Sequence, residues 1–253
     1  MNRLGIESLQ EAFGELGFVA RRLLPLTAHT TVDLLDKVTG RLGLAGAEKD
    51  ALIRETKRPE YLALAQVPFT LTLLAKVLAS KAKGVSEIAL SRTAVYDSSL
   101  VLLLGQDLQK AGRDAGMEAS MRSMLCSMSF WNHLSGTVTQ PWSSFFFLGA
   151  GVAVVQATNL SALASGDVRF THLSFQEFLS AEFLALLKNA FSELGDWLRA
   201  CSGDPWWSQV LLMTSEILPP AQRSAFLDAL ADNRCEEGEP HAERKENKTI
   251  SLE

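Results

Sequence analysis

The stretch Asp167 to Leu187, DVRFTHLSFQEFLSAEFLALL, determines how the rest of the chain is interpreted, because a short extended run leads directly into an amphipathic helix. Residues Val168 to Thr171 alternate apolar and polar side chains, which is typical of a half-buried strand. Ser174 precedes Glu177 by three residues, the capping-box pattern that starts a helix. Apolar residues then recur at helical spacing and predict one buried stripe: Phe175, Phe178, Leu179, Phe183, Leu186 and Leu187.

A lone histidine, His172, lies between the predicted strand and the predicted helix. The first backbone N–H groups of a helix lack intrahelical partners, and the positive end of the helix dipole lies there, so the position favours an anion such as phosphate. A histidine at such a corner can equally serve packing and hydrogen bonding alone, and the residues leave both roles open. Leu173 and Phe178 occupy the positions of a hydrophobic staple around the predicted cap.

A β-branched run, Val152 to Gln156, predicts a second strand. Paired with Val168 to Thr171, it gives a β-hairpin whose loop is Ala157 to Asp167. Gly136 to Gln140 is expected to be a loop, and Met117 to Leu134 a helix. A helix, a loop, a β-hairpin and a further helix are the parts of a winged-helix unit.

Most of the remaining chain predicts helices separated by glycine and proline. Pro68 is expected to open the most apolar of them, because a proline at the first helical position loses no hydrogen bond. Ser91 is expected to cap the longest, and Thr30 or Thr31 the first. The other predicted helices are Thr27 to Leu42, Ala47 to Thr56, Glu60 to Gln66, Phe69 to Ala82, Ser91 to about Lys110, Trp206 to Ile217 and Pro220 to Ala231.

This order of elements predicts a mainly α chain with several subdomains. We expect a helical domain at residues 27–112, a winged-helix domain with one small β-hairpin at 113–190, and the start of a second helical domain at 191–231. Residues 232–253 are charged with almost no apolar side chains, a composition that favours a disordered tail.

Composition indicates a globular protein and excludes some partners. Of 253 residues, 47% are hydrophobic and 21% charged, which is ample for a packed core. The net charge of −5 argues against a broad electrostatic surface for nucleic acid or for an anionic membrane. The cysteines, Cys126, Cys201 and Cys235, are far apart and odd in number, which indicates reduced thiols without a metal. With no signal-peptide pattern and no apolar run near the ~18 residues that span a membrane, a cytoplasmic location is expected.

The common catalytic motifs are absent from the sequence. No G-x-x-x-x-G-K-[ST] loop is present to hold a nucleoside triphosphate, and no strand ends in paired acidic residues. The histidines, His29, His133, His172 and His241, are not spaced as a metal cluster. We therefore expect no catalysis by this chain alone, no metal site and no cofactor of its own.

Four segments resemble, in order, the NACHT-type signalling NTPases, the group that includes NOD-like receptors. Phe170 to Ala181 is similar to that family's winged-helix motif, and Leu62 to Leu78 to its proline-containing helical motif. Leu90 to Tyr96 is similar to the entry of the next long helix, and Pro205 to Leu211 is a weaker match. The resemblance spans Phe18 to Leu230 and implies that residues 1–26 are the end of a nucleotide-binding core whose other strands this chain lacks.

The resemblance implies a regulatory portion that closes over ADP and controls nucleotide-dependent self-assembly. It implies that His172 contacts the β-phosphate and that Pro68 lines the adenine pocket, with ADP or ATP and Mg²⁺ bound only if a phosphate-binding core is supplied. Arg92 would then stabilise the junction between subdomains or pair with a carboxylate, although an exposed helix-start arginine fits as well. Trp206 and Trp207 are expected to pack in the core rather than stack on bases.

Two other hypotheses are kept. The chain can be a free-standing helical module for protein–protein interaction or self-association, with no nucleotide role; this predicts apolar surface near Phe18 to Leu24 and around Pro68. A DNA-binding winged helix is the weakest hypothesis because of the acidic charge balance.

Overall fold

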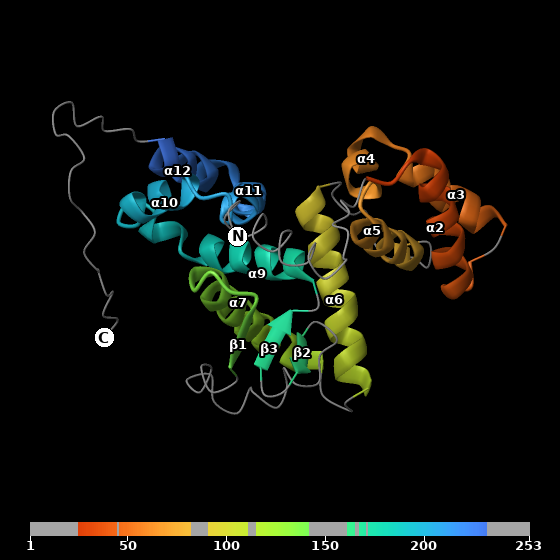
Figure 1. Cartoon of the computed structure of the whole chain (residues 1–253), viewed down its shortest axis with the longest axis horizontal. Helices are drawn as coiled ribbons and strands as arrows, with labels where there is room; N and C mark the ends of the chain where they lie inside the picture. The colour runs from red at the N-terminus through yellow and green to blue at the C-terminus, as the bar shows by residue number, and fades with distance from the viewer. Residues whose placement is uncertain are drawn as a thin grey trace, which may run out of the picture.

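The computed structural model describes residues 25–44, 46–81, 91–110, 115–141, 161–164, 167–170 and 172–231, and these are mainly helical, as the sequence predicts (Figure 1). Several predictions lie outside the described residues. They are most of the core remnant at residues 1–26, the strand Val152 to Gln156 and the tail 232–253.

The first part of the described chain is a group of helices. They are α2 (Ala28–Arg41), α3 (Ala47–Thr56), α4 (Pro59–Ala65) and α5 (Pro68–Lys81), close to the predicted ranges. The cap of α2 is Thr27, so the prediction of Thr30 or Thr31 is wrong. Thr27 Oγ1 accepts from the N–H of Thr30 at 3.3 Å, while Thr30 Oγ1 accepts from the N–H of Thr27 at 2.8 Å. Each of these threonines accepts from the backbone N–H of the other, so Thr30 is the partner of the cap within the first turn and Thr27 is the cap itself.

Helix α2 ends in a Schellman motif at Gly43, which has a positive φ of 70°. The N–H of Leu44 donates to the carbonyl of Thr39 at 3.0 Å, and the N–H of Gly43 donates to that of Gly40 at 3.3 Å. A side chain with a Cβ would be strained at this φ. After the turn, the side chain of Leu44 is buried in an apolar cluster with residues of α2, α3 and α5.

The middle of the chain contains the longest helices. They are α6 (Arg92–Lys110), the short 3₁₀ helix η1 (Ala115–Met117), α7 (Glu118–Leu134) and α9 (Leu173–Leu186). Ser91 caps α6 as predicted, since its Oγ accepts from the N–H of Ala94 at 3.1 Å. In Figure 1, α6 lies between the α2–α5 group and the rest, and α9 lies beside α7.

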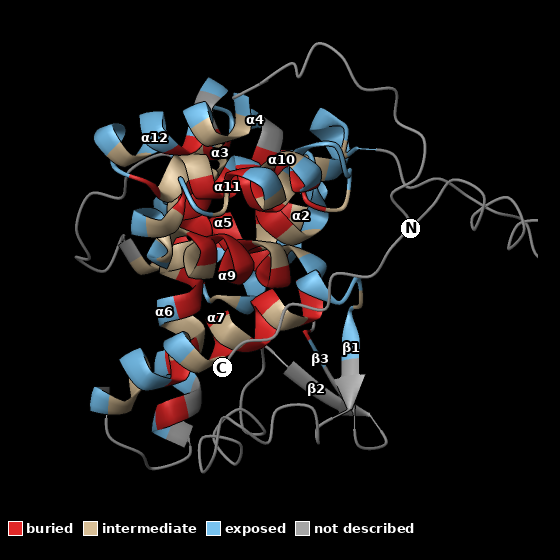
Figure 2. Cartoon of the chain, turned by 90° about the vertical axis from the view of Figure 1, so that its left-hand side faces the viewer, coloured by how far each residue is buried: buried red, intermediate tan, exposed pale blue. Residues whose placement is uncertain are grey.

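Helix α9 is buried on more than one stripe (Figure 2). Phe175, Phe178 and Leu179 are buried as predicted, but Leu186 is 68% exposed, so the predicted stripe is wrong at its end. The small residue Ser180 lies in the crossing with α7, where its Oγ is 2.9 Å from that of Ser129. Small side chains at this crossing allow the two helices to approach closely. The buried face of α9 therefore includes Ser180, Ala181 and Leu184, and Leu186 lies outside it.

A small sheet accompanies these helices. It contains β1 (Thr139–Pro141), β2 (Ser161–Ala164) and β3 (Asp167–Phe170) in the order β1-β3-β2, with both pairings antiparallel. The strand at β3 matches its prediction within one residue. The predicted loop Ala157 to Asp167 is wrong, because Ser161 to Ala164 within it pairs with β3. The loop predicted at Gly136 to Gln140 is wrong at its end, where Thr139 and Gln140 belong to β1. Ser161 to Ala164 lacks β-branched side chains, so only its backbone pairing defines it as a strand.

The last described part is again helical. It comprises η3 (Lys188–Ala190), α10 (Gly195–Ser202), α11 (Ser208–Ile217) and α12 (Pro220–Ala231). Helix α12 has the predicted bounds, and α11 begins two residues later than predicted. Helix α10 was not predicted, because it is short and starts at a glycine, a residue with low helix propensity. Its Leu198 and Cys201 are nevertheless buried.

The apolar side chains form two clusters that meet at α5. Leu71, Ala75 and Ala79 of α5 belong to the cluster with α2 and α3, whereas Leu73 and Leu74 belong to the larger cluster around α6, α7, α9 and α11. Helix α5 therefore presents apolar residues on opposite sides. Among the described helices, none combines the length and the apolar character needed to cross a membrane.

Candidate functional site

His172, not Ser174, is the N-cap of α9. The imidazole Nδ1 accepts from the backbone N–H of Ser174 at 3.2 Å, and the Oγ of Ser174 lies 2.6 Å from the same nitrogen. The predicted capping box is therefore wrong, because the helix begins at Leu173 and Ser174 is already in its first turn. Leu173 is the first residue of the helix and is 37% exposed, so it does not hold the position before the cap that the predicted staple requires.

These hydrogen bonds fix the protonation of the imidazole. Both Ser174 groups can donate to Nδ1, so Nδ1 carries the lone pair and the proton resides on Nε2. Burial lowers the pKa of His172 below its ordinary value, so the ring is neutral at pH 7. Within the described residues Nε2 has no hydrogen-bond partner. His172 thus presents one N–H donor at the start of a helix.

Helix α5 holds the other face of this imidazole. The rings of Phe69 and His172 are stacked, with centroids 3.7 Å apart and an interplanar angle of 4°. Phe69 also contacts Phe175 edge-on, at 5.7 Å between centroids. Pro68 is exposed at the first position of α5, directly before Phe69. The two sequence-predicted site residues, Pro68 and His172, are therefore neighbours through Phe69.

Polar groups of α6 and α9 adjoin Ser174, the serine that contacts this imidazole. The hydroxyl of Tyr96 forms a hydrogen bond with Ser174, and burial raises the pKa of Tyr96 above its ordinary value. Burial also raises the pKa of Glu177 to about 6, partly offset by the positive charge of Arg92. The serine that orients His172 is therefore itself held by α6.

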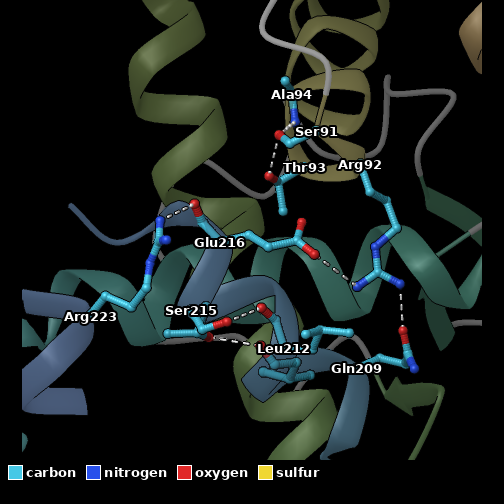
Figure 3. Close-up of polar contacts among 11 residues, drawn as sticks. Ser91, Arg92, Thr93, Ala94, Gln209, Leu212, Ser215, Glu216 and Arg223 are labelled. Carbon is cyan, nitrogen blue, oxygen red and sulfur yellow. Dashed lines mark hydrogen bonds and ion pairs between the residues drawn. The ribbon is translucent and has the colours of Figure 1, made fainter. Parts of the chain in front are cut away.

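Arg92 connects the start of α6 to α11 (Figure 3). Its Nη1 donates to Gln209 Oε1 at 2.6 Å, and its Nη2 lies 3.8 Å from Glu216 Oε1. The sequence left open whether Arg92 joins parts of the fold or is an exposed arginine at a helix start. The structure shows Arg92 at the junction of α6 and α11. The pair is incompletely satisfied, since Arg92 Nε, Arg92 Nη2 and Glu216 Oε2 are buried without a hydrogen-bond partner.

An ion-pair cluster that sequence reasoning missed joins three helices. Arg122 of α7 donates through Nε to Glu182 Oε2 of α9 at 3.1 Å and through Nη2 to Glu182 Oε1 and to Asp97 Oδ1 of α6. Glu182 also accepts from the thiol of Cys126 at 3.5 Å. The carboxylates outweigh the effect of burial and raise the pKa of Arg122, so the guanidinium stays charged.

A second missed cluster surrounds His133 at the end of α7. This fully buried ring stacks on Trp206 with 4.5 Å between centroids, and Trp207 contacts it edge-on. His133 Nε2 is 2.9 Å from the carbonyl of Trp206, and Trp206 Nε1 donates to the carbonyl of His133 at 2.8 Å. Both tryptophans therefore pack against this ring, as expected.

The capping role of His172 gives a direct stability prediction. His172→Ala should lower the free energy of unfolding by about 1 kcal/mol, because the N–H of Ser174 loses its acceptor, whereas His172→Asn should restore most of the loss. Ser174→Ala should cost less than His172→Ala, because the imidazole still accepts from the backbone. Urea unfolding of the three variants measures the order. A larger loss of stability in Ser174→Ala than in His172→Ala would indicate that Ser174 is the cap.

The described residues contain no cluster of three or more histidine, cysteine or acidic side chains that could hold a metal ion. No protein-family model matches the chain, and no curated protein matches it.

Proposed function

We propose that the chain is the regulatory helical and winged-helix portion of a NACHT-type signal-transduction NTPase. It closes over ADP held by a nucleotide-binding core and, in that closed state, opposes self-assembly. The four ordered segments that resemble the family motivate the proposal. The observation that carries it is the neutral imidazole of His172, whose Nδ1 is occupied by Ser174 and whose Nε2–H is a donor at the start of α9.

The surroundings of His172 suit a phosphate oxygen. An Nε2–H group can donate to such an oxygen, and the dipole of α9 adds a favourable field at the same place. Pro68 lies one residue before the stacked Phe69, which is consistent with an adenine on the same side of α5. The triphosphate loop and Mg²⁺ would come from the core, because the chain lacks the sequence motif that holds them.

The arrangement of elements also supports a winged-helix unit. Helix α7, the strands β1, β2 and β3, and helix α9 occur in the order that such a unit requires, and β3 leads directly to His172. A nucleotide contact at this junction would bias the closed position of the whole unit. A contact that exists in only one of two states shifts the balance between them by its own free energy.

The test is the rate of ADP release in a protein in which a nucleotide-binding core precedes this chain. His172→Ala should raise that rate about tenfold, the effect of losing a contact worth ~1.4 kcal/mol, and should increase the self-associated fraction. His172→Asn keeps an N-cap acceptor and therefore separates capping from phosphate binding. The matched control is His29→Ala, which removes an exposed histidine. Unchanged release from His172→Ala would reject the proposal.

A free-standing interaction module is the alternative, and apolar exposure near Pro68 favours it. Leu62 is 54% exposed and Val67 is 45% exposed. A cavity of about 220 Å³ lies beside them, with Leu26, Ile53 and Leu62 among its lining residues. The region of Phe18 to Leu24 lies outside the described residues. Sedimentation showing a dimer that Leu62→Asp dissociates would favour this alternative, since the nucleotide proposal assigns no dimer contact to Leu62.

A further inference from the structure

A second cavity, of about 390 Å³, lies between the end of α2, one face of α5 and one face of α6. From α6 it is lined by Ser99, Leu102, Leu103 and Gln106, which recur at the spacing of a single helical face. From α5 it is lined by Leu73 and Lys76, with Ala79 and Ser80 one turn further. The Schellman turn after α2 places Leu42 and Leu44 on the remaining wall.

The wall of this cavity is mostly apolar. Leucines come from all three sides, and the volume falls in the range of about 300 to 1,000 Å³ that is usual for small-molecule sites. The wall also joins the two apolar clusters of the fold, because Leu44 belongs to the first and Leu73 to the second. An apolar ligand here would fill the seam between them.

The polar groups of the cavity are few and suit one kind of head group. Ser99 is 3% exposed and its Oγ has no hydrogen-bond partner, which is costly for a buried hydroxyl. Among the described lining residues, Lys76 is the one with a charged side chain, and its side chain is exposed. Gln106 adds an exposed amide. The hydroxyl of Ser99 is closed off from the cavity, so the head group is set by the cation of Lys76, which has no acidic neighbour among the described lining residues and favours an anionic oxygen ligand.

We propose that this cavity binds a medium-chain carboxylate, with its alkyl chain against the leucines and its carboxylate on Lys76. The site is separate from His172 and does not depend on the proposed nucleotide role. The chain length follows from the volume, and the charge of the head follows from Lys76. A bound ligand would hold α6 against the α2–α5 group.

The probe is decanoate, added to the full chain below its micelle concentration and followed by calorimetry. Saturable binding at one site and a rise in the unfolding temperature are expected. Octanoate, with two fewer methylenes, should bind about 15-fold more weakly, because each buried methylene contributes a factor of about four in affinity. Decanol keeps the chain but lacks the charge, and it should bind more weakly than decanoate.

Variants connect binding to the cavity. Lys76→Gln should weaken decanoate at least threefold and leave decanol unchanged, whereas Lys188→Gln, an exposed lysine on η3, should change neither. Ser99→Ala should raise the unfolding temperature of the free chain, because it removes an unpartnered buried hydroxyl. Leu103→Trp should fill the cavity and abolish binding. No binding of decanoate, binding that Lys76→Gln does not alter, or equal affinity for decanol would overturn the proposal.

Discussion

Replacing Arg122 by methionine is expected to lower the free energy of unfolding by about 3 kcal/mol at neutral pH. The guanidinium is 27% exposed and holds Glu182, which is 16% exposed, through two of its nitrogens. Methionine keeps much of the side-chain volume but leaves a mostly buried carboxylate without its cation. Breaking such a pair costs ~3–5 kcal/mol when fully buried, and partial exposure reduces this figure.

Urea unfolding measures this loss, and further variants isolate its cause. Adding Glu182→Leu to Arg122→Met should recover most of the stability, because the unpaired carboxylate is then removed as well. Asp97→Asn should cost much less than Arg122→Met, since Asp97 is 48% exposed. Arg58→Met, which removes a surface arginine paired with Glu55, is the matched control. A double variant less stable than Arg122→Met would contradict the proposed origin of the effect.

Acidification from pH 7 to pH 4 is expected to destabilise the fold through His133 by on the order of 2 to 3 kcal/mol. Burial lowers the pKa of His133 to about 4, from an ordinary value of 6.5, and the bond to Trp206 only partly opposes this. The folded state therefore binds fewer protons than the unfolded state between these pH values. Its stability is fully present above pH 6.5 and is lost as the pH falls toward 4.

The pH dependence of the urea midpoint tests this expectation. His133→Phe keeps a ring against Trp206 but cannot titrate, so the loss of stability between pH 6.5 and 4 should become smaller. Glu177 acts in the opposite direction, because its pKa is raised to about 6, and its unfavourable charged form develops as the pH rises from 4.5. His29→Phe, which replaces an exposed histidine in the same way, is the control. An unchanged slope in His133→Phe would assign the acid effect to other groups.

The local signals in the sequence predicted most helix positions. The prolines that open α5 and α12 and the hydroxyl of Ser91 before α6 each act on neighbours within one turn. The prediction of the cap of α9 was wrong because a contact distant in sequence decides it. Ser174 and Glu177 match the capping-box pattern, but His172 reaches the same N–H group from two residues earlier, and its contact with Phe69 over a long sequence distance holds it there.

The other site residues depend on contacts that no local pattern contains. Arg122 meets Glu182 and Asp97 from 60 and 25 residues away, and Arg92 meets Gln209 from 117 residues away. One signal was available for Arg122, because it is the single arginine or lysine in helix α7, whose central turns are otherwise apolar or small. A lone cation on a helix that must be buried needs a partner, even though the sequence cannot say which carboxylate provides it.

The two-sided apolar surface of α5 has a consequence for how the chain opens in solution. Because its leucines and alanines belong to both apolar clusters, α5 stays covered on one side when either neighbouring group of helices detaches. Its amide protons should then exchange with deuterium only when the whole described body unfolds. Those of α3 and α12, which contribute few buried side chains, should exchange through smaller openings.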